Sequence, residues 1–175
     1  MDGDYKTLLR LFINICLIKK GPRDIPESTT LLQTTFIAYL LSGMVLLSSA
    51  NSIGEATVQA LIETVLLGVF TYFLVVFFAF PHRFNQSVTA IYGSGALITS
   101  ISIPFVFWLE ALSKNGEQAG IAGLVVFLIV FWGFIVMANI IRETIQKQLS
   151  ICLLLTFCYV YASYRVIDFV YPITT

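Results

Sequence analysis

Long runs of apolar residues, separated by short polar breaks, occupy the chain from Thr29 onward. Five such runs are found, at 30–50, 56–80, 87–109, 119–141 and 149–170. Each holds about 20 residues or more, the length that crosses the hydrocarbon core of a bilayer once. Because backbone amides in lipid must be satisfied within their own segment, each run is predicted to be a helix. An outer-membrane barrel would instead show alternating segments of about ten residues, which the chain lacks.

The residues before Thr29 follow a different pattern. Residues 4–19 carry apolar side chains at helical spacing, namely Leu8, Leu11, Phe12, Ile15 and Ile18. The apolar part of this stretch is too short to cross a bilayer, so we expect a helix that lies in the membrane interface. Gly21 and Pro22 are expected to end this helix inside a polar elbow at 18–28, and Ser28 can cap the next helix.

The composition agrees with a membrane protein. Of the 175 residues, 58% are hydrophobic and 11% are charged, and the mean hydropathy is +0.88. A soluble domain carries about 25% charged residues, so this chain has too little charge to cover a water-soluble globule. The net charge is zero and no basic run occurs, which argues against a nucleic-acid partner. We therefore predict an all-α polytopic membrane helix bundle with five transmembrane helices and an N-terminal interfacial helix.

The distribution of cations predicts the orientation. Five Lys or Arg residues precede the first run, one lies in 81–86 and two lie in 142–148, whereas Lys114 is the single cation of the opposite loops. Cytoplasmic loops are enriched in Lys and Arg, so the N-terminus is expected in the cytoplasm and the C-terminus on the opposite side. Residues 1–28 then form a cytoplasmic interfacial helix and Pro-rich elbow, and residues 29–175 form a five-helix transmembrane domain.

Several polar residues lie within the predicted spans. Gln59 and Glu63 share one face of the second span, and Tyr161, Arg165 and Asp168 follow i, i+4, i+7 spacing in the fifth. A charged side chain at this depth is costly and normally faces a partner or a water-filled cavity. We expect these residues to form one polar cluster that opens to the non-cytoplasmic side. The cluster could clamp two helices together, or it could bind a substrate, a lipid headgroup or a proton.

Small residues in the third and fourth spans indicate close helix packing. Gly93, Ser94 and Gly95 follow one another in the third span, and Gly120 and Gly123 lie at the start of the fourth. Small side chains let neighbouring helices approach closely in lipid. These five residues are predicted to be helix-packing positions.

The chain offers no recognisable catalytic or metal-binding motif. Its three cysteines, Cys16, Cys152 and Cys158, lie in apolar stretches without metal spacing and are expected to be buried and inert. The single histidine, His82, lies in a predicted loop, and a metal site normally needs further His or Cys ligands. We therefore expect no catalytic residue, no metal and no cofactor.

Two segments resemble parts of a known family. "FNQSVTAIYGSGALITSISIP" (84–104) resembles the third span of the Yip family, five-span membrane proteins named for interaction with Ypt/Rab GTPases. "WGFIVMANIIRETIQKQLSICLLLTFCYVYASY" (132–164) resembles that family's last two spans. The resemblance covers about residues 29–171 and, with the short N-terminal part, is closest to small bacterial members. It implies a non-enzymatic protein of a bacterial inner membrane.

Two functional interpretations follow. The first is a protein of membrane organisation, or an accessory subunit of a membrane complex, which docks through the small-residue faces of spans three and four. Its partners would be membrane lipids and either other membrane proteins or a second copy of itself. The alternative is a transporter or channel component that moves a small solute, a proton or a lipid with the Glu63 and Arg165 cluster. An enzyme acting on lipids would need site chemistry that the sequence does not show.

Overall fold

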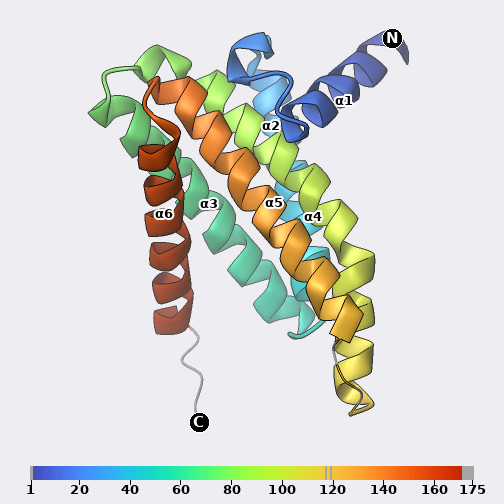
Figure 1. The fold of residues 1–175 in the computed structure, drawn as a ribbon. Helices are drawn as coiled ribbons and strands as arrows, with labels where there is room; N and C mark the ends of the chain where they lie inside the picture. The colour runs from blue at the N-terminus through green and yellow to red at the C-terminus, as the bar shows by residue number, and fades with distance from the viewer. Residues whose placement is uncertain (1, 117, 119, 171–175) are drawn as a thin grey trace.

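Helices make up all the regular structure in the part of the chain that the computed structural model describes, which is residues 2–116, 118 and 120–170 (Figure 1). In chain order the elements are α1 (Asp2–Cys16), η1 (Pro22–Asp24), α2 (Thr29–Leu47), α3 (Ile53–Phe77), η2 (Pro81–Arg83), α4 (Phe84–Lys114), α5 (Gly120–Ile145) and α6 (Leu149–Val170). Helices α2 to α6 are long and apolar enough to cross a membrane. This confirms the predicted all-α fold with five candidate spanning helices.

The ends of several helices differ from the predicted ones because hydrophobicity does not decide where a helix stops. Helix α3 begins at Ile53 because Ser52 and Glu55 form a capping box. In this box Ser52 Oγ accepts from the Glu55 N–H (3.4 Å) and the Glu55 carboxylate accepts from the Ser52 N–H (3.2 Å). Helix α4 continues beyond its apolar residues to Lys114, whose Nζ lies 3.5 Å from the Glu110 carboxylate one turn earlier.

The N-terminal helix ends earlier than expected. Helix α1 stops at Cys16 rather than near residue 19, because Ile18 adopts the left-handed conformation (φ 59°) and the Lys19 N–H turns back to the Asn14 carbonyl (2.9 Å). The expectation that Gly21 and Pro22 end the helix was therefore wrong. Gly21 has another role, because a side chain at this position would overlap the carboxylate of Glu143.

Helix α1 packs against the bundle through the side chains near its C-terminal end. Phe12 and Cys16 are buried, with 7% and 4% of their surface exposed. Phe12 packs on Gly93 of α4, where a larger residue would overlap the ring. Trp132 Nε1 of α5 donates a hydrogen bond to the Cys16 carbonyl (2.9 Å). Figure 1 shows α1 projecting from the bundle beyond this contact, with its N-terminal end farthest away.

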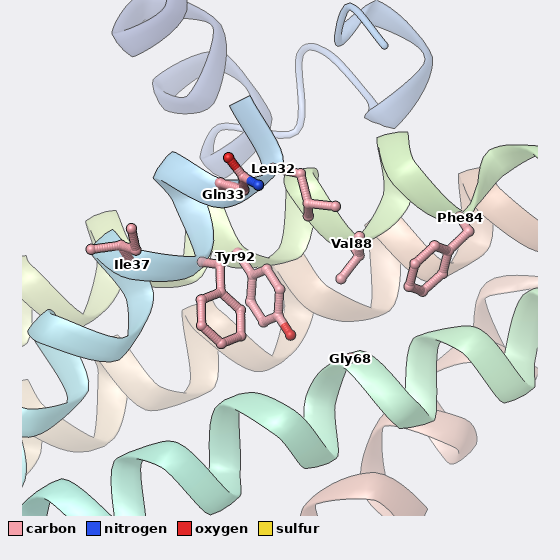
Figure 2. Close-up of a pocket in the computed structure, with 8 residues that line it drawn as sticks. Leu32, Gln33, Ile37, Gly68, Phe84, Val88 and Tyr92 are labelled. Atoms are coloured by element: carbon pink, nitrogen blue, oxygen red, sulfur yellow. The ribbon is translucent and has the colours of Figure 1, made fainter. Parts of the chain in front are cut away.

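Tyr92 of α4 lies at the centre of the packing between α2, α3 and α4. Its ring contacts Phe36 and Tyr39 of α2, with ring centroids 5.6 and 5.5 Å apart. Its buried hydroxyl donates to the Thr64 carbonyl of α3 (2.7 Å) and points at Gly68 in Figure 2. Phe36, Gly68 and Tyr92 border a mostly apolar cavity of about 540 Å³ between the three helices, which Gln33 also lines (Figure 2). The cavity contains no group that suggests chemistry, and the tyrosine acts as a packing element.

Helix α6 contacts the bundle mainly through its first half. Cys152 and Thr156 are fully buried, and the rings of Tyr159 and Phe70 of α3 lie 4.8 Å apart. Beyond Tyr159 the helix is mostly exposed, and Figure 1 shows it separating from α3 and α5 toward its C-terminal end. This divergence determines which polar residues of α6 can meet those of α3.

Candidate intramembrane site

Glu63 lies on α3, about 15 Å from the start of that helix at 1.5 Å per residue. Gln59 Nε2, one turn earlier, donates a hydrogen bond to Glu63 Oε1 (3.0 Å). Among the residues that the structure describes, no Lys, Arg or His lies within ion-pair distance of Glu63. The carboxylate is therefore held by its own helix and receives no cation from another one.

Arg165 and Asp168 form a separate pair on α6. Arg165 Nη1 lies 3.6 Å from Asp168 Oδ2, and 62% of the arginine side chain is exposed. Tyr161, the third predicted member from this helix, is 60% exposed. The structure thus joins Arg165 with Asp168, and in the described part of the chain no hydrogen bond or ion pair links them to Glu63. The prediction that these residues form one polar cluster was therefore wrong. The physical reason is that α6 crosses α3 near Tyr159 and then diverges, as Figure 1 shows.

A groove of about 450 Å³ borders Glu63. Its polar lining comes from four helices: Tyr39 of α2, Glu63 of α3, three hydroxyl residues of α4, and Thr156 and Tyr159 of α6. The α4 residues are Ser94, Thr99 and Ser102. Val160 also lines the groove and is 49% exposed, so the groove reaches the surface that would face lipid. We call this space the Glu63 groove. It combines one carboxylate with six hydroxyl groups, a set that can accept and donate hydrogen bonds.

Five polar residues of the groove were absent from the sequence-based set, namely Tyr39, Thr99, Ser102, Thr156 and Tyr159. Tyr159 and Thr156 lie three residues apart and face the same side of α6, whereas Tyr161 and Arg165 face away. The polar residues alone do not indicate which face of α6 turns inward. The two faces can be distinguished only when the buried Cys152 and Thr156 are known.

A second polar site was not anticipated at all. Arg23 of the elbow and Arg83 of η2 converge on the C-terminal end of α5. Arg83 Nη1 donates to the Thr144 carbonyl (3.0 Å), and both guanidinium groups lie 3.4 Å from the Glu143 carbonyl. With its amide oxygen turned inward, Gln146 also accepts from Arg23 (2.8 Å) and Arg83 (2.9 Å). We call these residues the arginine junction.

The arginine junction satisfies carbonyl groups that a helix end leaves without partners. It also places residues 18–28, 81–86 and 142–148 at one end of the bundle, the top of Figure 1. The loops between α2 and α3 and between α4 and α5 lie toward the opposite end. Successive loops thus lie at alternating ends of the bundle, as successive crossings of a membrane would require.

The small residues of α4 are used within the chain itself. Gly93 receives Phe12 of α1, and a side chain at Gly95 would lie 2.7 Å from the Tyr39 ring of α2. Ser94 is buried, and its carbonyl accepts from the Cys16 thiol (3.8 Å). All three pack against elements of this chain, and Ser94 and Gly95 also line the Glu63 groove.

The corresponding glycines of α5 differ. Gly120 has nothing within 4 Å of the position that a side chain would occupy, and its φ is +24°. It therefore begins the helix in an open position and makes no packing contact, which corrects the prediction. Gly123 lies within α5 and is half-buried.

The remaining candidate groups carry no site. His82 is exposed in η2, and the described residues contain no group of three or more potential metal ligands. Burial raises the pKa of the Cys16 thiol to about 11, which keeps it unreactive. Cys158 is exposed on α6, so the expectation that all three cysteines are buried was wrong.

Comparison with known proteins finds no matching family model, no matching curated protein and no matching solved structure. The resemblance to the Yip family therefore stays a prediction that depends on the two segments at 84–104 and 132–164.

Proposed function

We propose that the chain is a non-enzymatic integral protein of a bacterial inner membrane that engages another membrane component at the Glu63 groove. The observation that carries this proposal is a carboxylate inside a candidate spanning helix that has no cationic partner in the described chain. A charged or polar group at that depth is stabilised when a partner supplies a cation or hydrogen-bond donors. The groove brings Glu63 within reach of such a partner from the lipid side.

The arrangement of Glu63 argues against a purely internal clamp. A clamp would tie α3 to a second helix, and the recorded bond of Glu63 runs to Gln59 on the same helix. Removing that bond should cost the fold little, because side-chain pairs one turn apart contribute about 0.2–0.5 kcal/mol. The cost of placing the Glu63 carboxylate inside the membrane would therefore be offset by a binding partner.

The partner we propose is a transmembrane segment of another membrane protein, or of a second copy, that carries a hydrogen-bond donor or a cation. Such a role fits an accessory subunit or a protein of membrane organisation, as the Yip-like segments also imply. The small residues of α4 do not form a separate docking surface, because Phe12 packs on Gly93 and the Tyr39 ring lies beside Gly95. Ser94 and Gly95 instead border the Glu63 groove. We therefore assign docking to the Glu63 groove.

The proposed orientation keeps the N-terminus in the cytoplasm. It draws support from the arginine junction, which gathers the cation-rich segments at one end of the bundle. This asymmetry of Lys and Arg is what sets orientation in bacterial inner membranes.

Purification of the full-length protein from native membranes in a mild detergent tests this function. We expect wild-type protein to retain a defined membrane-protein partner, or to form a dimer, and Glu63→Leu to lose it while keeping its thermal stability. Glu110→Gln is the matched control, because this carboxylate lies at the far end of α4 beside Lys114. A complex of unchanged mass in Glu63→Leu would exclude the groove as the docking site.

Transport is the second candidate, and the hydroxyl-lined volume of the Glu63 groove favours it. A component that moves protons or small solutes should give flux in proteoliposomes that Glu63→Gln abolishes. Equal flux in wild-type and variant vesicles, at the level of empty vesicles, would remove this candidate.

A further inference from the structure

A second groove, distinct from the Glu63 groove, lies between α1, α2 and α4. It measures about 650 Å³ and is lined mostly by apolar atoms. Leu8 and Leu9 of α1 form one wall, and Ala38 of α2 and Leu97 of α4 form the others. We call this space the α1 groove.

The α1 groove runs along α2 for about 12 Å, since its lining extends from Thr30 to Ala38 at 1.5 Å per residue. The wall formed by α1 is incomplete because this helix packs on the bundle only near its C-terminal end, through Phe12 and Cys16. Toward the N-terminus α1 moves away from the bundle, as Figure 1 shows. An elongated apolar molecule is therefore the shape that the space accommodates.

A cation marks one end of the α1 groove. Lys6 lines the groove together with Ser28 and Thr30, the residues at the start of α2. Arg10 follows Lys6 by one helical turn and lines an adjoining hollow with it. Among the residues whose side chains the structure describes, which begin here at Lys6, no carboxylate lies within ion-pair distance of Lys6 or Arg10. Lys6, Ser28 and Thr30 therefore give the groove positive charge and hydroxyl groups, and the rest of its lining is apolar apart from Thr34, Thr35 and Ser100.

The outer surface of α1 continues the apolar surface of the groove. Leu9, Ile13 and Leu17 recur every four residues, and 44–52% of each side chain is exposed. A stripe of this kind beside Lys and Arg is typical of a helix that rests on the lipid headgroup region. The start of α2 lies at the end of the bundle that also holds the arginine junction. In the proposed orientation this end faces the cytoplasmic leaflet, where anionic lipids attract basic residues.

From these features we infer that the α1 groove binds one anionic phospholipid. The phosphate contacts Lys6 and the hydroxyl groups at the start of α2, and one acyl chain lies between α1, α2 and α4. The lipid fills the space that α1 leaves open and fixes the angle at which this helix leaves the bundle. Binding of a protein segment in this groove in place of a lipid would contradict the inference.

Native mass spectrometry of the full-length protein, titrated with phosphatidylglycerol or phosphatidylcholine, tests the inference. We expect one phosphatidylglycerol per chain to bind more tightly than phosphatidylcholine. Lys6→Ala should weaken phosphatidylglycerol binding about fivefold, because one basic residue near an anionic lipid surface contributes about that much to the affinity. It should leave the affinity for phosphatidylcholine unchanged. Lys20→Ala is the matched control, because Lys20 is an exposed cation of the elbow that does not line the groove.

A second variant tests the apolar part of the site. Ala38→Phe places a ring in the groove from an exposed position of α2, so the helix itself should fold normally. It should reduce the binding of both lipids and leave the elution profile in detergent unchanged. Equal affinity for the two lipids, equal effects of Lys6→Ala and Lys20→Ala, or undiminished binding in Ala38→Phe would each overturn the inference. These results are independent of Glu63 and of its proposed partner.

Discussion

Gly68 and Tyr92 provide the sharpest test of the packing between α3 and α4. The Tyr92 hydroxyl donates to the Thr64 carbonyl (2.7 Å), and a Cβ at position 68 would lie 2.6 Å from that hydroxyl. Gly68→Ala should therefore push the hydroxyl away. The lost bond costs about 1 kcal/mol, and the crowding costs about 1–3 kcal/mol. The better helix propensity of Ala returns about 1 kcal/mol, so the net destabilisation is about 1–3 kcal/mol.

The effect of Gly68→Ala on the free energy of unfolding should have the opposite sign when the Tyr92 hydroxyl is absent. In a Tyr92→Phe background the nearest ring atom is Cζ, 3.8 Å from the new Cβ, which is an ordinary contact. Gly68→Ala should then stabilise the protein by up to about 1 kcal/mol. The difference between the two backgrounds is a coupling energy of about 1–4 kcal/mol, which overlaps the range of about 0.5–3 kcal/mol seen for residues in contact. Tyr92→Phe alone should cost about 1 kcal/mol.

The assay is the free energy of unfolding, measured by titration with SDS in mixed micelles and followed by tryptophan fluorescence. All four proteins of the cycle are compared under one detergent condition. If Gly68→Ala changed stability equally in both backgrounds, the hydroxyl would not occupy the position described, and the account of the α3–α4 contact would fail.

Three further predictions concern α1 and the arginine junction. Gly93→Leu should displace Phe12 and release α1, so that Cys16 reacts with a maleimide. Gly54→Leu is the control, because this position has open space around it, and it should leave Cys16 protected. Protection of Cys16 in both variants would contradict the packing of Phe12 on Gly93. In the folded wild-type protein Cys16 should stay unreactive as the pH rises from 7 to 9, because burial raises its pKa to about 11; rapid labelling at pH 9 would contradict its burial. Arg83→Ala should destabilise the fold by about 1–3 kcal/mol, because it loses charge-assisted hydrogen bonds to the end of α5. Thermal unfolding should show that Arg83→Lys restores only part of this stability. Full rescue by Lys would mean that the several hydrogen bonds of the guanidinium group are not needed.

Hydrophobic pattern alone predicted the spanning helices, because the length of an apolar run is set by the bilayer and not by the tertiary fold. The ends of these helices depend on local hydrogen bonds. The capping box of Ser52 and Glu55 could have been recognised from the sequence. The left-handed turn at Ile18 could not, because a β-branched residue is the least expected at such a position.

Contacts between helices were harder to predict. Residue spacing placed Gln59 and Glu63 correctly on one face of α3, and these two residues are hydrogen-bonded. The predicted pairing of Glu63 with Arg165 failed because the sequence does not show where α6 contacts α3. This contact lies at Tyr159, whose ring is beside Phe70, and Arg165 follows six residues later. The arginine junction joins Arg23 and Arg83, which are 60 positions apart in sequence. No periodicity links residues in different loops.

The most direct measurement of the central claim is photocrosslinking inside native membranes from a benzoyl-phenylalanine at Val160, which lines the Glu63 groove. The account predicts one defined adduct to a membrane-protein segment or a second copy of the chain, in high yield. It also predicts that Glu63→Leu removes this adduct and that Glu110→Gln leaves it unchanged. An adduct of equal yield in all three proteins, or crosslinks to bulk lipid alone, would contradict the claim that the carboxylate recruits a partner.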